Sequence, residues 1–316
     1  MINISKYIQS NRVIKTYLDN IELLKEYDEY QHFISRLNVT KKVQTDAKYF
    51  ENIVNNLSEC VDMSVNDVVK QLLDNDSKGF LKKICETNNP DIYRYLYLTH
   101  ISDFYSICKR NKVVLYDELL KNLTELFTSD ETIDFLCRLC KNKDLREKEG
   151  TWGSNGIGYV LFYFNHTKEN KAKLEEAFYD VFDYYINQYN IDDRDSVYGL
   201  THCLLHFSRF YTEDIYKNTF ERIENLYDKS KDLIKNSFSS LGKIQRMNSD
   251  MIAELLVVYK MLVKYEDKYS AEAYNELVRR IDNKYNIIAS NEADDFTQLL
   301  KSNEHTNILF ILYCRL

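Results

Sequence analysis

Two histidines four residues apart form the clearest chemical pattern in the sequence. His202 and His206 fall in a stretch whose apolar periodicity predicts a helix over 196–210, so both imidazoles are expected on one helix face. Two imidazoles at this spacing suit zinc or another borderline metal ion. The zinc-protease pattern needs a glutamate directly after the first histidine, but Cys203 stands there. His202 and His206 are therefore candidate metal ligands; alternatively, they are two histidines on a partly buried aromatic face.

A short triplet extends the histidine pattern to other parts of the chain. Leu-Thr-His ends at His100 and again at His202, and His305 follows 103 residues after His202. If the chain repeats at this interval, each copy would hold two helix hairpins and aim its imidazole at a shared central cavity. On this interpretation His100, His202 and the nearby Asp103 are candidate catalytic residues. The alternative is that each histidine packs locally and hydrogen-bonds a carbonyl.

Glycine is concentrated in one segment. Four of the seven glycines and the only tryptophan, Trp152, lie within 150–158. Glycine allows the backbone to approach a ligand or another helix closely. The segment lacks the preceding strand and the following Lys-Ser/Thr of a phosphate-binding loop. It is either a tight helix entrance or a loop at the rim of a cavity; in the second case Trp152, Asn155 and Tyr198 are candidate substrate-binding residues.

Two other clusters have structural explanations that we favour. Cys137 and Cys140 fall late in a predicted helix. We interpret them as two core positions rather than a redox pair. The acidic runs at 192–195 and 294–295 precede predicted helices, where carboxylates act as caps and favour the helix dipole.

The elements that must position these residues are almost all helical. The chain has 316 residues but only seven glycines and one proline, and apolar residues recur at three- and four-residue steps nearly throughout. Helices are predicted over 12–38, 46–60, 168–190, 196–210, 213–239, 249–265, 269–286 and 294–314, among others, with Gly242 marking a turn. Short connections imply successive antiparallel hairpins.

These hairpins are expected to form a single helical domain over 1–316, with a candidate subdomain break at 143–153. Segments such as 159–164 are apolar nearly all round, as in helices buried on every side. This favours an (α/α)6-type toroid, in which inner helices are ringed by outer ones. An α-solenoid or an irregular helical bundle is the alternative. The apolar C-terminal stretch 308–316 is expected to pack inside, closing the ring against the first hairpin.

Two pieces carry a resemblance to a known family. Gly-Ser-Asn-Gly-Ile-Gly-Tyr-Val-Leu at 153–161 and Tyr-Gly-Leu-Thr-His-Cys-Leu-Leu at 198–205 resemble the glycine-containing inner-helix starts of lanthionine-cyclase-like α/α toroid proteins. The resemblance implies a toroid. Members that cyclise peptides hold zinc with two cysteines and a histidine in Trp-Cys and Cys-His-Gly contexts, which this sequence lacks, so no catalytic residue is carried over.

Net charge and cysteine content limit the kinds of binding partner and the cellular compartment that we expect for this protein. A net charge of −7 argues against nonspecific binding to nucleic acid. No apolar stretch is long enough to span a membrane, and the first residues lack the apolar segment of a signal peptide, so we expect none. Seven cysteines in apolar surroundings suit free thiols in a reducing compartment, so we expect a cytoplasmic protein.

Two functions fit these observations. The first is an enzyme with a central cavity that acts on a peptide or a carbohydrate by acid–base or metal-assisted chemistry, with zinc as the candidate cofactor. The second is a noncatalytic helical scaffold that binds a protein or peptide partner. Convergence of His100, His202 and His206 in one pocket would favour the enzyme, whereas scattered histidines beside an open apolar groove would favour the scaffold.

Overall fold

The computed structural model describes residues 4–24, 117–141, 152–207, 224–289 and 295–316, together with residues 98, 102, 105 and 293. The predicted all-α fold class is confirmed, because within these residues the only strands are two of two residues each. The described helices and strands are α1 (Ile4–Asp19), η1 (Ile21–Leu24), α6 (Asp117–Thr128), α7 (Asp130–Lys141), α9 (Trp152–Tyr163), α10 (Lys168–Asn187), α11 (Arg194–Phe207), α12 (Glu224–Ser237), α13 (Leu241–Arg246), α14 (Ser249–Val263), α15 (Lys268–Arg279), β1 (Ile281–Asp282), β2 (Ile287–Ile288), α16 (Phe296–Ser302) and α17 (Glu304–Arg315).

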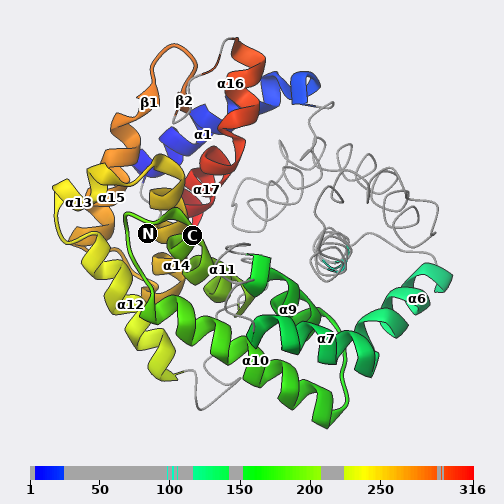
Figure 1. Cartoon of the computed structure of the whole chain (residues 1–316). Coiled ribbons are helices and arrows are strands. Elements are labelled where there is room, and N and C mark those ends of the chain that lie inside the picture. Colours follow the sequence, from blue (N-terminus) through cyan, green and yellow to red (C-terminus); the bar gives the residue numbers. More distant parts are fainter. Residues whose placement is uncertain are drawn as a thin grey trace.

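The described helices lie in two curved rows (Figure 1). The inner row runs through α9, α11, α14 and α17, each packed against the next. The outer row includes α7, α10, α12 and α15, which pack against inner helices from outside. Successive helices alternate between the rows, as expected for antiparallel hairpins joined by short loops. The inner helices are therefore covered on several sides.

Helix α14 shows how the sequence dictates a central position. Asn248 caps it by accepting a hydrogen bond from the Met251 backbone N–H at 2.8 Å, and Lys264 ends it in the left-handed conformation. Every residue from 251 to 259 is buried. A helix that is apolar nearly all round must be enclosed, and α14 accordingly contacts α11, α12, α15 and α17.

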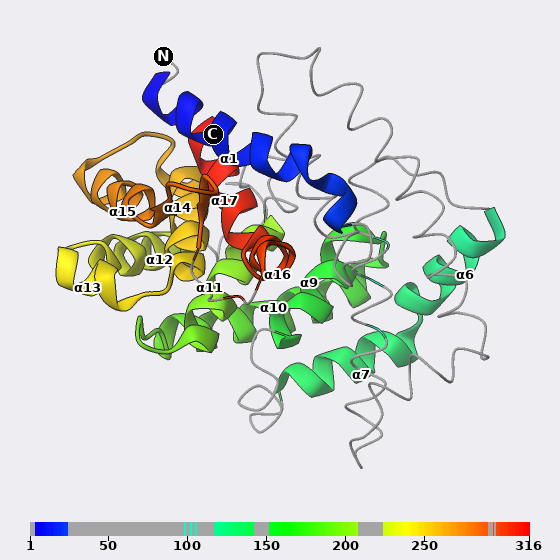
Figure 2. The same ribbon diagram turned by 90° about the horizontal axis from the view of Figure 1, so that it is seen from above.

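The two ends of the chain pack against each other. α17 lies against α1, and both figures bring these helices together (Figure 2). The Lys6 ammonium donates to the Tyr313 hydroxyl at 3.0 Å, pairs with Glu266, and lies over the rings of Tyr274 and Tyr313. Residues 308–314 are all buried, which confirms the predicted internal position for this part of the stretch 308–316, whereas Leu316 at its end is exposed.

Some predicted boundaries are wrong. The first helix begins at Ile4 rather than 12, and its described part ends at Asp19, while 25–38 lies outside the described residues. The helix predicted over 269–286 ends at Arg279, and an antiparallel hairpin follows in which Ile281 pairs with Ile288. Gly242 lies within α13 rather than at a turn, because Ser240 caps a helix over it. The predicted helix 294–314 is divided into α16 and α17 at Asn303.

A glycine sets the close approach of α10 and α11. A Cβ added at Gly199 would lie 2.1 Å from a ring carbon of Tyr185, a distance that no real contact tolerates. We expect Gly199→Ala to lower the free energy of unfolding by about 1–3 kcal/mol, the usual cost of overpacking a core. Denaturant titration measures this change.

Gly242→Ala is the matched control. The added Cβ meets nothing within 4 Å, so the same substitution should stabilise α13 by about 0.5–1 kcal/mol. Equal effects at the two positions would show that Tyr185 moves aside without cost.

Candidate functional site

Three neighbouring inner helices bring titratable side chains to one place. α14 supplies Asp250 and Glu254, which are one helical turn apart and share a face. α17 supplies His305 from its first turn, and α11 supplies His202. One potential ligand atom from each of Asp250, Glu254 and His305 lies within 4.8 Å of the others, the only such group of three among the described histidines, cysteines and carboxylates.

Asp250 is held from several sides. One of its oxygens lies 2.8 Å from Nδ1 of His305 and accepts a hydrogen bond of 2.8 Å from the Thr306 hydroxyl. Its other oxygen accepts from the Tyr198 hydroxyl. Burial alone would raise the pKa of Asp250, but His305 and the hydrogen bonds from His305, Tyr198 and Thr306 hold this pKa well below its usual value. Asp250 is therefore a carboxylate, which only accepts, so Nδ1 of His305 must carry the proton.

Tyr198 links Asp250 to α11. Burial, followed by the negative charges of Asp250 and Glu254, raises the pKa of the Tyr198 hydroxyl far above its usual value. The hydroxyl thus remains protonated and serves as a donor. The Tyr198 ring stacks on the His202 ring at a centroid distance of 6.1 Å, and the Arg194 guanidinium lies 5.0 Å from the Tyr198 ring centre.

Glu254 is the buried centre of the cluster. Its side chain is 1% exposed and lies within the otherwise apolar run of α14. One carboxylate oxygen accepts from the Thr201 hydroxyl. The other lies 3.5 Å from Nε2 of His202 and 3.5 Å from Nε2 of His305. Burying a carboxylate is costly unless it is compensated, and these contacts from α11 and α17 supply the compensation.

The cluster has an enclosed side and an open side. Glu254 lies inside, whereas the side chains of Asp250, His202 and His305 are 19%, 20% and 32% exposed. A carboxylate is thus shielded from water while two imidazoles border the solvent. This is an arrangement that can hold a cation, or give and take protons at a bound molecule.

The start of α17 is held by the Asn307 side chain, which forms the pair of hydrogen bonds to β2 that a neighbouring strand would form. Oδ1 of Asn307 accepts from the Ile288 N–H at 2.8 Å, and Nδ2 of Asn307 donates to the Ile288 carbonyl at 3.0 Å. Nδ2 also donates to the Asn303 carbonyl at 2.7 Å. These bonds tie the first turn of α17 to β2 and so determine where His305 stands.

The structure separates the two histidines that the sequence paired. His202 reaches Glu254, whereas His206 is buried among aromatic rings of α9 and α10. Its ring lies edge-on to Tyr159 at 4.9 Å and to Phe178 at 6.2 Å. Within the described residues His206 joins no group of three potential ligands, so the structure does not bring it to the cluster.

The glycine segment is explained in part by this packing. α9 begins at Trp152, and a Cβ at Gly158 would lie 2.5 Å from the His206 ring. Gly158 therefore lets the two inner helices approach closely, but it does so in the middle of α9 rather than at the predicted helix entrance. Trp152 and Asn155 belong to the first turn of α9, but their side chains lie outside the described residues.

Of the remaining predicted site residues, one lies in the cluster and the others lie outside the described part of the chain. Tyr198, predicted to bind substrate, is buried and holds Asp250 in place. His100 and Asp103 lie outside the described residues. The sequence does not single out Asp250, Glu254 or His305 as site residues, although His305 stands 103 residues after His202. One feature of the sequence could have indicated the site: Glu254 is a charged residue in a helix that is otherwise apolar on nearly all sides.

The structural interpretations of the other clusters are confirmed where the structure describes them. Cys137 and Cys140 are free thiols, and Cys137 donates to the Lys173 carbonyl at 3.6 Å. Burial, followed by the charge of Asp134, raises the pKa of Cys137 to about 11, so this thiol stays protonated at neutral pH. Asp295 caps α16 by accepting from the Gln298 N–H at 2.8 Å.

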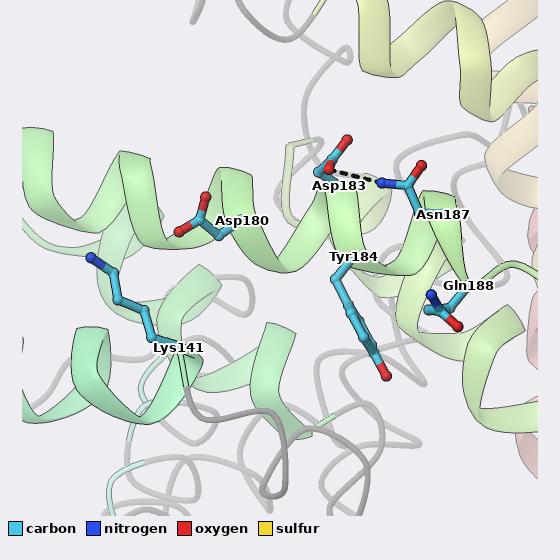
Figure 3. A pocket seen from close by; sticks show the side chains of 6 residues that line it. All are labelled: Lys141, Asp180, Asp183, Tyr184, Asn187 and Gln188. Atoms are coloured by element: carbon cyan, nitrogen blue, oxygen red, sulfur yellow. Dashed lines mark hydrogen bonds between the residues drawn. The ribbon is translucent and has the colours of Figure 1, made fainter.

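A cleft of about 400 Å³ is formed by side chains of α10, the residue that follows it, and the last residue of α7 (Figure 3). It is lined by Lys141, Asp180, Asp183, Tyr184, Asn187 and Gln188. Asn187 donates to Asp183 at 2.8 Å within the same helix. The lining is polar and wide open, and it shares no residue with the cluster.

Comparison with known proteins adds one match. Residues 160–315 match a family described as a domain of unknown function (DUF3541). This segment includes Tyr198, His202, Asp250, Glu254 and His305, so every residue of the cluster falls inside it. No curated protein and no solved structure matches the chain significantly. No helix in the described ranges is long and apolar enough to cross a membrane.

Proposed function

We propose that the protein is an enzyme that acts on a peptide or a carbohydrate within the cavity of an α/α toroid, by acid–base or metal-assisted chemistry. One observation carries this proposal: two imidazoles and two carboxylates converge from α11, α14 and α17 around the buried Glu254. The alternation of inner and outer helices supports the toroid.

The side chains take different roles in this proposal. His202 and His305, which border the solvent, face the substrate and are the catalytic residues. Glu254 lies between the two imidazoles, and its negative charge stabilises the protonated form of each. Asp250 and Tyr198 are positioning residues, because Asp250 orients the His305 ring and Tyr198 orients Asp250. An imidazole oriented by a carboxylate is a common feature of catalytic and metal sites.

The scaffold alternative requires a continuous apolar surface for a partner. The large apolar side chains most exposed among the described residues come from different elements: Ile8, Leu23, Leu120, Leu241, Tyr265 and Leu316. They lie on α1, η1, α6, α13, the α14–α15 loop and the C-terminus. Scattered apolar residues are normal on any protein surface. The enzyme is the function that the cluster of histidines and carboxylates supports.

A substrate panel tests the proposal. Peptides and oligosaccharides of defined sequence are incubated with the purified chain, and products are detected by mass spectrometry. We expect turnover of at least one class, and we expect His202→Asn to lower kcat/KM by roughly 10²–10⁴-fold, the usual contribution of a positioned acid or base.

His166→Asn is the matched control, because His166 is a half-buried histidine outside the cluster that bonds to the Val160 carbonyl at 2.8 Å. It should retain full activity. Turnover that survives both substitutions equally would place catalysis elsewhere. Partner capture without turnover of any panel member would favour the scaffold.

A further inference from the structure

We infer that Arg194 binds a carboxylate group of the substrate, so that the site takes acidic peptides or acidic sugars. The inference rests on the proposed function, but its main readout is binding and needs no turnover. Arg194, Tyr198 and His202 are spaced four residues apart on α11 and therefore share one face of the helix. The Arg194 guanidinium lies 5.0 Å from the centre of the Tyr198 ring, which stacks on the His202 ring. Arg194 is thus the first member of a row that leads to the cluster.

The charge of Arg194 has no counter-ion within the described part of the chain. Its side chain is exposed and forms no ion pair with any described residue. The acidic neighbours are engaged elsewhere, because Asp192 pairs with Arg246 at 3.3 Å and Asp193 accepts from the Asp195 N–H at 3.1 Å. A guanidinium presents five N–H donors in a planar fork that matches the two oxygens of a carboxylate. This fork therefore remains available to a carboxylate from outside the chain.

Helix stability does not explain the place of Arg194. It stands in the first turn of α11, where the helix dipole favours an acidic side chain and disfavours a cation. The backbone around it is nevertheless held firmly. The Asn190 N–H donates to the Ser196 hydroxyl at 2.7 Å, and this hydroxyl donates to the Asn190 carbonyl at 3.1 Å. Because the backbone is fixed before a ligand arrives, less conformational entropy is lost on binding.

The row also determines how far the bound carboxylate lies from the reacting bond. Eight residues of a helix rise about 12 Å, which is the length of the row from Arg194 to His202. His202, at its inner end, borders the solvent beside Glu254 and is a catalytic residue of the proposed function. An extended peptide advances about 3.3 Å per residue, so about three or four residues span the row. We therefore expect the carboxylate about three or four residues from the bond that reacts.

Matched pairs of ligands test this inference on the full chain. Peptides with an acidic side chain or a free C-terminus are compared with their amide counterparts, and oligosaccharides of uronic acids with their methyl esters. Calorimetry measures the dissociation constant of each ligand. We expect the carboxylate member of at least one pair to bind roughly 10–100-fold more tightly than its neutral counterpart, the usual effect of hydrogen bonds between charged groups. The pair that shows this preference identifies a peptide or a sugar as the source of the carboxylate.

Variants of Arg194 show whether the preference comes from this side chain. Arg194→Gln should remove the preference, because glutamine is uncharged. Arg194→Lys should keep part of it, because lysine retains the charge but lacks the planar fork. Arg138→Gln is the matched control and should bind like the wild type. Arg138 is an exposed arginine on α7, outside the cluster, and its guanidinium lies 5.5 Å from the centre of the Phe135 ring.

The outcomes separate this inference from the proposed function. Circular dichroism confirms that each variant is folded. The inference is overturned if no carboxylate ligand binds more tightly than its neutral counterpart, or if Arg194→Gln keeps the preference. Carboxylate binding that Arg194→Gln abolishes, without turnover of any ligand, would keep the inference and refute the enzyme. Turnover of neutral ligands alone, with Arg194→Gln fully active, would keep the enzyme and refute the inference.

Discussion

Deleting residues 308–316 is expected to abolish cooperative unfolding. The deletion removes seven buried side chains of α17, from Ile308 to Cys314, which pack against α14 and α1. Burying one such side chain contributes about 1.5–3 kcal/mol. Seven together match the whole stability of a typical domain, roughly 5–15 kcal/mol. The contact between the two chain ends, including the Lys6–Tyr313 hydrogen bond, is lost as well.

Calorimetry and circular dichroism during heating measure this effect. Deletion of Leu316 alone is the control, because this residue is exposed, and it should leave the melting transition unchanged. A protein lacking 308–316 that still melts sharply at the wild-type temperature would show that α17 is dispensable.

Glu254→Gln is expected to cause a loss of activity as large as that of His202→Asn. Glutamine keeps the shape and the hydrogen bond with Thr201 but removes the charge that faces both imidazoles. On the proposed function, kcat/KM should fall by roughly 10²–10⁴-fold. The melting temperature should also fall, because the substitution removes one partner of a buried charge cluster, so activity is compared at a temperature where the variant is folded.

The measurement compares initial rates on a substrate identified by the panel, with thermal melting of the same preparations. Glu276→Gln is a matched control, because Glu276 is a buried carboxylate paired with Arg280 at 3.0 Å on α15, outside the cluster. Activity close to wild type in folded Glu254→Gln would remove this carboxylate from the mechanism.

The helical part of the fold could be predicted because local periodicity determines it. The absence of strand signals, the three- and four-residue steps, and the apolar end of the chain all appear in the structure as helices and a buried C-terminus. The hairpin after α15 could not be predicted this way. Its residues Ile281, Tyr285 and Ile288 recur at helical spacing, but the Asp282 carboxylate accepts from the Lys284 and Tyr285 N–H groups. Asn286 adopts a positive φ of 56°, which completes the turn.

The site could be predicted only in part, because it depends on distances between helices. The spacing of His202 and His305 pointed to related positions, and both lie 3.5 Å from one oxygen of Glu254. The pairing of His202 with His206 followed from their shared helix face. It did not anticipate that His206 faces the aromatic rings of α9 and α10 while His202 faces α14. Which side chains come together is determined by how neighbouring helices pack, not by the spacing of two residues within one helix.

NMR of the imidazole nitrogens during stepwise addition of zinc tests whether the residues of the cluster form one site. It measures the chemical shift of each histidine ring at each zinc concentration. The chain has six histidines, so single substitutions assign each ring. If Asp250, Glu254 and the two imidazoles form one site, His305 must shift strongly at one equivalent of zinc and His202 must respond in the same step, whereas His166 and His206 stay unchanged. Independent responses of His202 and His305, or equal shifts of all histidines, would contradict a single functional site at the junction of α11, α14 and α17.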